Sequence, residues 1–276
     1  MSKIPLAGVI GSPIGHSKSP LVHGSWLREH GLRGHYVPLH VDAQDLEPVL
    51  RALPHMGFVG VNVTIPHKEK VLALADDISE VAARIGAANT LTFGPDGRIH
   101  ADNTDGYGFL ANLRQSAPDW RPDAAPALVL GAGGAARAII VALLDAGVPQ
   151  IRLCNRTRTR AEGLAREFGP NVVVRDWKGR AQALDDLGLL VNTSSLGMVG
   201  NPALDMPLDG LSPGALVTDI VYTPLMTDLL QHAQQRGNPV VDGVGMLLHQ
   251  AVPGFERWFG HRPEVTDTLR ALVLGQ

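Results

Sequence analysis

The stretch Val129-Leu130-Gly131-Ala132-Gly133-Gly134-Ala135-Ala136-Arg137 decides the fold of this chain. The apolar residues 127–130 before the turn are typical of a buried strand, and apolar side chains at helical spacing follow it from 139 to 144. Gly131, Gly133 and Ala136 occupy the three small positions of the fingerprint G-x-G-x-x-G/A. In that fingerprint a strand enters a tight turn, the backbone approaches a pyrophosphate, and the new helix packs closely on the strand. The helix N-terminus then presents free N–H groups to the phosphates.

The next strand is predicted at Ile151–Cys154, and Asn155-Arg156-Thr157 follows it. An acidic residue about 20 residues after the fingerprint holds a ribose 2′-hydroxyl in NAD sites. Here an amide and a guanidinium stand instead, and a guanidinium can bind a 2′-phosphate with two hydrogen bonds. The sequence therefore predicts NADP(H) as the cofactor. The alternative is a solvated basic turn, since Arg158 and Arg160 follow closely.

Composition restricts the class of protein. The chain has 276 residues, of which 45% are hydrophobic and 18% charged, with a net charge of −3. These values indicate an ordinary globular protein large enough for two cores, and they argue against a nucleic-acid binder.

The single cysteine, Cys154, excludes an internal disulfide framework and favours a reducing compartment. No signal-peptide pattern or membrane-spanning apolar run is found, so we expect a cytoplasmic protein without a membrane partner. The eleven histidines show no zinc-ligand spacing, and we expect no metal site.

The order of elements predicts an α/β protein with two domains. Because the fingerprint begins only at Gly131, another domain precedes it, and that part also alternates strands and helices. We expect an N-terminal α/β substrate domain with a mostly parallel sheet, formed by 1–105 plus 244–276, and a C-terminal Rossmann-like NADP-binding domain at 106–243. The predicted strands of the front domain lie at 6–10, 35–41, 58–65, 90–93 and 98–101, and those of the nucleotide domain include 127–130, 151–154 and 189–192. Helices are expected, among others, at 21–30, 46–53, 105–113, 224–236, 244–259 and 263–274.

Polar residues in the front domain gather where predicted strands end. Ser17 and Ser19 lie between the first strand and the first helix, with Ser19 as the expected N-cap and an anion site at the helix N-terminus. Strand alternation places Asn62 and Thr64 on one face and Val61, Val63 and Ile65 on the other.

Lys68 follows directly, at the position where α/β sites usually form. Asn89 and Asp105 stand at further element ends, although a turn residue and a first-turn acid explain them equally well when each is taken alone.

Seven motifs together resemble the shikimate dehydrogenase family. They occur in the family's order from Gly11 to Gln250 and are, in sequence, G-x-P-I-x-H-S-x-S-P, N-V-T-x-P-x-K, A-A-N-T, D-N-T-D-G, G-A-G-G-A-x-R, N-R-T and D-G-x-G-M-x-x-x-Q. The resemblance implies NADPH-dependent reduction of 3-dehydroshikimate to shikimate, in the pathway to chorismate and the aromatic amino acids. Family members occur as monomers and dimers, so a homodimer stays open.

The resemblance also implies roles for individual residues. It places the substrate carboxylate at Ser17 and Ser19 with Tyr222 nearby, and the remaining substrate contacts at Asn62, Thr64, Lys68, Asn89, Asp105 and Gln250. It places the pyrophosphate on Gly131, Ala132, Gly133, Gly134 and Ala135, and the 2′-phosphate on Asn155, Arg156, Thr157 and Arg160. Ile220 and Gly243 line the nicotinamide end, and Glu80 is a weaker match near the cofactor. Ile220 is a minor departure, because some relatives carry Met there.

Lys68 and Asp105 are the expected catalytic residues. Reduction of a ketone builds negative charge on its oxygen, and a proton donor must stand within about 3 Å of that oxygen. We expect Lys68 to be this donor and Asp105 to fix Lys68 and to accept a hydrogen bond from a substrate hydroxyl. The rival interpretations are a quinate/shikimate dehydrogenase that uses NAD and a non-catalytic binding protein on the same scaffold. Asn155-Arg156 speaks against the first rival, and the presence of both Lys68 and Asp105 speaks against the second.

Overall fold

The computed structural model describes residues 4–276, and it divides into two compact units. Unit 1 comprises residues up to Gly108 together with Leu247–Gln276, and unit 2 comprises Phe109–Met246. The expected domain boundaries, 105/106 and 243/244, each lie three residues from the boundaries of these units. The predicted α/β class with two parallel-rich sheets is confirmed.

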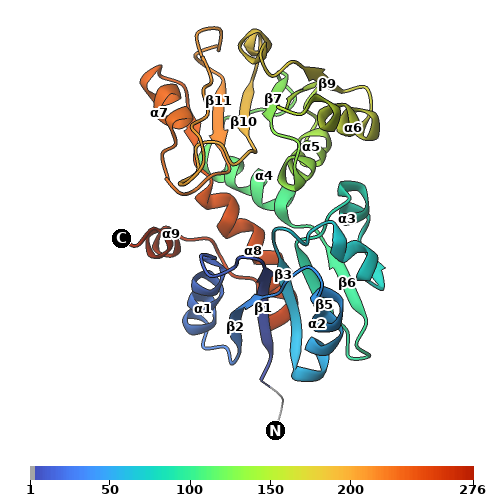
Figure 1. Ribbon diagram of the computed structural model, residues 1–276. Coiled ribbons are helices and arrows are strands. Elements are labelled where there is room, and N and C mark those ends of the chain that lie inside the picture. The colour runs from blue at the N-terminus through green and yellow to red at the C-terminus, as the bar shows by residue number, and fades with distance from the viewer. Residues whose placement is uncertain (1–3) are drawn as a thin grey trace. The chain divides into compact units, whose positions relative to one another are not determined.

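Unit 1 is built on a six-stranded sheet in the order β2-β1-β3-β5-β6-β4 (Figure 1). The strands are β1 (Leu6–Gly11), β2 (His35–His40), β3 (Phe58–Val63), β4 (Asp77–Ile78), β5 (Thr90–Phe93) and β6 (Ile99–Asp102). Only the pairs of β5 with β3 and with β6 are antiparallel. Because β5 alone runs in reverse, its start lies at the same edge of the sheet as the carboxyl ends of β3 and β6, and the register pairs Thr90 with Asn62 and with Asp102.

Helices of unit 1 cover this sheet. They are α1 (Ser19–Glu29), α2 (Leu46–Ala52), α3 (Glu80–Ile85) and α9 (Asp267–Leu274), with 3₁₀ turns at Leu53–Met56 and Lys70–Leu74. Helix α9 packs against α1. The chain passes between the units within α4 (Asp105–Ser116) and within α8 (Val244–Phe259). One core cluster joins β3, β5 and β6 to α2, and the fully buried Leu46, Leu50 and Val61 belong to it.

Unit 2 is an all-parallel sheet in the order β12-β11-β10-β7-β8-β9. The strands are β7 (Ala127–Leu130), β8 (Ile151–Cys154), β9 (Val172–Arg175), β10 (Leu189–Asn192), β11 (Leu216–Asp219) and β12 (Val240–Val241). Numbered within the unit, this is the order 6-5-4-1-2-3 of the dinucleotide-binding fold, and it confirms the Rossmann-like prediction. The register places Asp219, Asn192, Leu130 and Cys154 in one row, so the carboxyl ends of four strands form one edge.

The helices of unit 2 are α5 (Gly134–Asp145), α6 (Arg158–Phe168) and α7 (Asp228–Gln235), with a 3₁₀ turn at Arg180–Leu184. Figure 1 shows α5 and α6 beside β7, β8 and β9, and α7 beside β11. Ala136 is fully buried in the core with Val129 and Ile139, so the third small position of the fingerprint does let the helix pack closely on the strand.

Several expected details are wrong. Helix α7 begins at Asp228 rather than 224, because Thr227 caps it by accepting from the Leu230 amide. Helix α9 begins at Asp267 rather than 263, with Thr266 as its cap. Ser19 is not the N-cap of α1, since the helix begins at Ser19 itself and Lys18 is the cap residue.

Ile65 also departs from the expectation. Strand β3 ends at Val63, so the alternation stops before Ile65 and its side chain is 74% exposed rather than buried with Val61 and Val63. Strand β4, with two residues, and helix α3, with six, are too short to be recognised by period, and neither was predicted.

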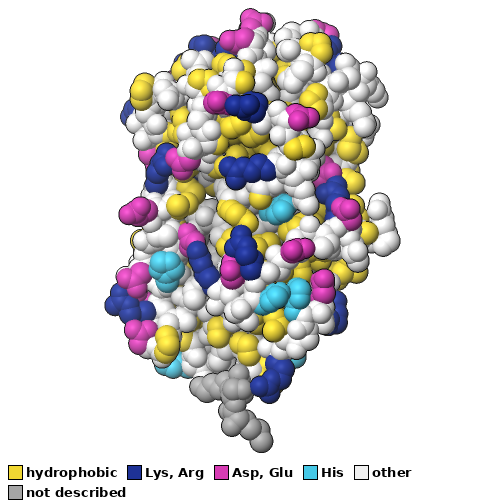
Figure 2. Space-filling view, turned by 180° about the vertical axis from the view of Figure 1, so that it is seen from behind, with side chains coloured by type: hydrophobic (Ala, Val, Ile, Leu, Met, Phe, Trp, Pro, Cys, Tyr) yellow, Lys and Arg dark blue, Asp and Glu magenta, His cyan; other side chains and the backbone are white. Residues whose placement is uncertain are grey.

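Within residues 4–276, no helix is long and apolar enough to cross a membrane. The face shown in Figure 2 carries Lys and Arg side chains interspersed with Asp and Glu. This mixture matches the small net charge of −3.

Candidate active site

An ammonium–carboxylate pair forms the centre of the candidate site in unit 1. Lys68 Nζ donates to Asp105 Oδ2 at 2.5 Å, and the two side chains are 20% and 7% exposed. Lys68 follows the carboxyl end of β3, and Asp105 is the first residue of α4, three positions after the end of β6. The sheet therefore brings together two residues that lie 37 positions apart in the sequence.

The other oxygen of Asp105 is held by Asn89. Asn89 Nδ2 donates to Asp105 Oδ1 at 2.7 Å and to Gln250 Oε1 at 3.3 Å. Asn89 Oδ1 in turn accepts from the amide of Thr104 at 2.8 Å and from the hydroxyl of Thr90 at 2.9 Å. The structure thus joins Lys68, Asp105, Asn89 and Gln250 in one cluster, although Gln250 comes from α8, far along the chain.

The motif D-N-T-D-G is used almost in full. Asn103 Oδ1 accepts from the Asp105 amide at 3.0 Å, so Asn103 fixes the start of α4. Asp102 accepts from Ser79 Oγ at 2.6 Å and pairs with Arg257 of α8 at 2.5 Å. Thr104 Oγ1 donates to the Gln250 carbonyl at 2.8 Å. From the sequence, a role was predicted only for Asp105. Asp102, Asn103 and Thr104 could have been found only because they belong to the same motif.

The remaining expected substrate contacts of unit 1 lie at the ends of β1 and β3. Thr64 is half-buried next to β3, and its hydroxyl has no hydrogen-bond partner within residues 4–276. A Cβ at Gly11 would lie 2.6 Å from Thr64 Cγ2, so only glycine at the end of β1 allows Thr64 this position. Ser17 Oγ accepts from the Ser19 amide at 3.3 Å, at the N-terminus of α1. Glu80 is exposed as the first residue of α3.

The amide of Asn62 is fully committed within unit 1. Its Oδ1 accepts from the Tyr36 hydroxyl at 2.7 Å, and its Nδ2 donates to the Asn89 carbonyl at 3.1 Å and to Thr90 Oγ1 at 3.2 Å. Asn62 is buried next to the cluster that contains Lys68 and Asp105. The side-chain amide of Asn62 therefore connects Tyr36 to Asn89 and Thr90.

In unit 2, the glycine turn has the geometry of an anion cradle. Gly131 has φ of 114°, and a Cβ there would lie 2.6 Å from Thr193 Oγ1, so glycine is required. A Cβ at Gly133 or Gly134 would meet nothing within 4 Å, so one side of the turn is open. No side chain caps the N-terminus of α5, and its first N–H groups stay available to an anion.

The second anion-binding feature of unit 2 follows β8. Asn155 Nδ2 donates to the Thr157 carbonyl at 2.8 Å, and no side chain caps the N-terminus of α6. Arg158 pairs with Glu162 and Asp176, whereas the exposed side chains of Arg156 and Arg160 have no partner within the described part of the chain. Two unpaired guanidinium groups near an uncapped helix N-terminus fit a phosphate better than a neutral hydroxyl.

Ile220 and Gly243, both expected at the nicotinamide end, are adjacent. A Cβ at Gly243 would lie 2.5 Å from the Ile220 carbonyl oxygen, so only glycine fits at that position. Tyr222 follows two residues after Ile220, and burial raises the pKa of its hydroxyl.

Asp219 is a buried carboxylate that sequence reasoning missed. It accepts from Asn192 Nδ2 at 3.0 Å, from the Val221 amide at 3.0 Å and from Thr227 Oγ1 at 2.8 Å. Burial raises the pKa of Asp219 to about 6, although these hydrogen bonds oppose the shift. The position at the carboxyl end of β11, one residue before Ile220, was the only available signal.

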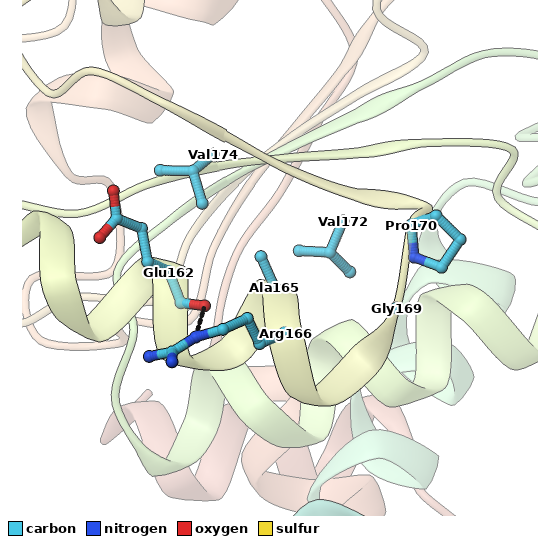
Figure 3. Close-up of a pocket in the computed structure, with 7 residues that line it drawn as sticks. All are labelled: Glu162, Ala165, Arg166, Gly169, Pro170, Val172 and Val174. Carbon is cyan, nitrogen blue, oxygen red and sulfur yellow. Dashed lines mark hydrogen bonds between the residues drawn. The ribbon is translucent and has the colours of Figure 1, made fainter.

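Two further features lie outside these sites. Figure 3 shows a pocket between α6 and β9, lined by Glu162, Ala165, Arg166, Gly169, Pro170, Val172 and Val174, and it contains none of the expected site residues. Within residues 4–276, no group of three or more His, Cys, Asp or Glu side chains is placed to hold a metal ion.

Comparisons with known proteins agree along the whole chain. Three family models match in succession: the shikimate dehydrogenase substrate binding domain over residues 9–91, shikimate / quinate 5-dehydrogenase over 115–196, and the shikimate 5′-dehydrogenase C-terminal domain over 243–273. A curated relative from Roseobacter denitrificans, shikimate dehydrogenase (NADP(+)), is 64% identical over 275 residues, which covers 100% of this chain and 99% of the relative.

Solved structures show the same likeness. Shikimate 5-dehydrogenase from Thermus thermophilus, in complex with NADP(H) and shikimate, has a TM-score of 0.88 and 35% identity, covering 99% of this chain and 100% of that one. Quinate dehydrogenase from Corynebacterium glutamicum, in complex with NAD, has a TM-score of 0.91 and 31% identity, covering 98% and 99%.

Proposed function

The chain belongs to the shikimate dehydrogenase family, and on this premise we propose that it catalyses the reversible NADPH-dependent reduction of 3-dehydroshikimate to shikimate. This reaction is a step of the shikimate pathway to chorismate and the aromatic amino acids. The observation that carries the proposal is the Lys68–Asp105 pair, held by Asn89 at the edge of the unit 1 sheet. Unit 1 is accordingly the substrate-binding and catalytic domain, and unit 2 binds NADP(H).

Lys68 is the proton donor for ketone reduction and the proton acceptor in the reverse direction. Charge develops on the carbonyl oxygen during reduction, and an ammonium group next to that oxygen both stabilises the charge and supplies the proton. Asp105 holds Lys68 through Oδ2, and because Asn89 occupies its Oδ1, the carboxylate cannot rotate freely. Asp105 also accepts a hydrogen bond from a substrate hydroxyl.

Substrate recognition uses the polar groups around this pair. Ser17 and Ser19 at the N-terminus of α1 bind the substrate carboxylate, since a helix N-terminus favours an anion. The resemblance adds Tyr222 as a further substrate contact. The Thr64 hydroxyl, which no group among the described residues engages, binds the ring hydroxyls together with Asn89 and Gln250. Asn62 lines the pocket and acts through its bonds to Asn89 and Thr90.

The residues of unit 2 fit NADP(H). Gly131 to Ala135 bind the pyrophosphate on the open side of the glycine turn, and Asn155, Arg156, Thr157 and Arg160 bind the 2′-phosphate. Ile220 and Gly243 pack at the nicotinamide end, and Glu80 is the remaining cofactor contact. When bound, NADPH supplies the hydride, and the protein supplies orientation and the proton.

A quinate dehydrogenase that uses NAD is the second candidate, because a structural neighbour of that kind covers almost the whole chain. The two candidates are separated by steady-state rates with shikimate or quinate and NADP or NAD, followed by the absorbance of the reduced nicotinamide. We expect turnover with shikimate and NADP to exceed each of the other three combinations. A preference for quinate with NAD would overturn the proposal, and no turnover with any pair would indicate a binding protein.

We propose that the protein works in the cytoplasm. Cys154 is a free buried thiol, and burial raises its pKa to about 11. A protein whose one cysteine forms no disulfide is compatible with a reducing compartment. The resemblance allows a monomer or a homodimer, and light scattering on the purified protein used for the assay distinguishes the two.

A further inference from the structure

Tyr36 is a buried tyrosine of unit 1 that the mechanism above does not use. Its hydroxyl donates to Asn62 Oδ1 at 2.7 Å, and its ring stacks on His23 with centroids 3.9 Å apart and planes inclined by 4°. Trp258 of α8 lies beside both rings. The hydroxyl therefore reaches out of an aromatic cluster toward the amide of Asn62, and the side chain of Ser19 also interacts with it.

The Asn62 amide satisfies all of its neighbours in one orientation, and the bond from Tyr36 belongs to that orientation. Its Nδ2 faces the Asn89 carbonyl and Thr90 Oγ1, at 3.1 and 3.2 Å. Thr90 uses its only proton on Asn89 Oδ1 and must accept from Asn62. A flipped amide would turn Oδ1 toward the Asn89 carbonyl oxygen, and two acceptors would meet. With Nδ2 so placed, Oδ1 is left for the Tyr36 hydroxyl.

The Asn89 side chain connects this network to Asp105 and Lys68. Because its Oδ1 is occupied by Thr90 and by the Thr104 amide, its Nδ2 points to Asp105 Oδ1 and Gln250 Oε1. Asp105 then presents Oδ2 to Lys68. One continuous series of side-chain hydrogen bonds thus leads from the Tyr36 hydroxyl through Asn62, Thr90 and Asn89 to the Lys68–Asp105 pair.

We propose that Tyr36 is a positioning residue for the reaction: acting through Asn62, its hydroxyl fixes the orientation of Asn89 and thereby the geometry of the Lys68–Asp105 pair, without touching the substrate. The inference rests on the proposed function of that pair. Buried hydrogen-bond networks in which every member is satisfied are rigid, and loss of one member affects the others.

Tyr36→Phe tests this role, since it keeps the ring and its stacking on His23 and removes only the hydroxyl. We expect kcat/KM for shikimate to fall about tenfold, the scale of one buried hydrogen bond, while KM for NADP changes less than about twofold. Tyr107→Phe is the matched control, because Tyr107 is a half-exposed tyrosine of the same unit whose hydroxyl bonds Arg262. The control should match the wild type in all constants.

A double-mutant cycle with Asn62→Ala separates positioning from general damage to unit 1. If Tyr36 acts through Asn62, the double variant loses no more activity than Asn62→Ala alone. Losses that multiply would overturn the proposal, as would a Tyr36→Phe variant within about twofold of wild type. If Asn62→Ala does not fold, the Tyr36→Phe variant decides alone, by comparison of its change in kcat/KM for shikimate with its change in KM for NADP. Equal changes in the two quantities reject the role. Normal wild-type turnover of shikimate shows that the underlying function holds.

Discussion

The two units use the same edge of an α/β sheet in opposite ways. Unit 2 forms its site from groups that its own side chains do not occupy: a glycine turn with free space, two helix N-termini without side-chain caps, and two arginine side chains that have no partner within residues 4–276. Unit 1 forms its site from buried side chains that are almost all hydrogen-bonded to one another, around Asn62, Asn89 and Asp105. A cofactor phosphate needs accessible N–H groups and positive charge, whereas proton transfer needs groups held in fixed positions.

Burial shifts the pKa of one group in each unit, in opposite directions. Burial in unit 1 lowers the pKa of His23 to about 3, partly opposed by the nearby Asn62 side chain. Burial in unit 2 raises the pKa of Asp219 to about 6. Burial disfavours the charged form of both groups, the imidazolium of His23 and the carboxylate of Asp219. Acidification therefore destabilises unit 1 through His23 and stabilises unit 2 through Asp219.

The largest expected effect tests the role of unit 1 in proton transfer. Lys68→Ala should lower kcat by about 10²–10⁴-fold, the range for loss of a general acid–base group, with a much smaller change in KM. Steady-state kinetics in both directions provide the measurement. Lys70→Ala is the control, because Lys70 is an exposed lysine of the same segment that bonds the Ala43 carbonyl. Normal turnover of Lys68→Ala would remove Lys68 from the mechanism.

The next effect is the pH response of unit 2. The folded pKa of Asp219, about 6, lies above the ordinary value of 3.8, so its contribution to stability is complete below pH 3.8 and is lost as the pH rises through 6. Between about pH 4 and 7 this loss amounts to about 2–3 kcal/mol of the free energy of unfolding. Asp219→Asn should abolish it, because the amide stays neutral.

Urea unfolding of wild type and variant at about pH 4 and about pH 7 measures this difference. The amide oxygen of Asp219→Asn can still accept from Asn192 and Val221. Asp205→Asn, at a side chain that is 91% exposed, should follow the wild type. A stability difference between Asp219→Asn and wild type that does not change with pH would contradict the assignment.

Cofactor discrimination in unit 2 follows in size. Arg156→Ala should weaken NADPH binding by about 1.5–3 kcal/mol, the scale of a hydrogen bond to a charged group, and should leave the use of NADH nearly unchanged. Fluorescence titration with each nucleotide gives both affinities. In Arg158→Ala, which loses a side chain already paired with Glu162 and Asp176, NADPH affinity should change less. Equal losses for both nucleotides in Arg156→Ala would show that Arg156 does not bind the 2′-phosphate.

The smallest expected effect is the acid response of unit 1. His23 has a folded pKa of about 3 against an ordinary value of 6.5, so stability is complete above pH 6.5 and is lost as the pH falls toward 3. By about pH 5 the loss amounts to about 1.5–2 kcal/mol. In His23→Leu this acid dependence should disappear, and because both ring nitrogens of His23 lack partners within residues 4–276, no other group is left unpaired. An unchanged acid dependence in urea unfolding between about pH 7 and about pH 5 would reject this role of His23.

Much of unit 2 could be predicted because its signals are contiguous. The strands at Ala127–Leu130, Ile151–Cys154 and Leu189–Asn192 were predicted with their observed bounds, since each is a short apolar run between turn residues. Helix starts were less predictable: α7 and α9 begin at Asp228 and Asp267, where Thr227 and Thr266 supply the caps. A proline indicates that a helix begins within a few residues, but the capping residue decides where it begins.

The sequence by itself determined the α/β class, the dinucleotide fingerprint and the types of residue at each strand end, because these depend on local spacing and on side-chain chemistry. Only the tertiary structure decided that Lys68 meets Asp105, that Asn89 and Gln250 share one cluster, and that Tyr36 and Asp219 belong beside the sites. The reversed strand β5 brings Asn89 to the edge where β3 and β6 end. Contacts between distant segments follow from sheet register and packing, which no local pattern in the chain specifies.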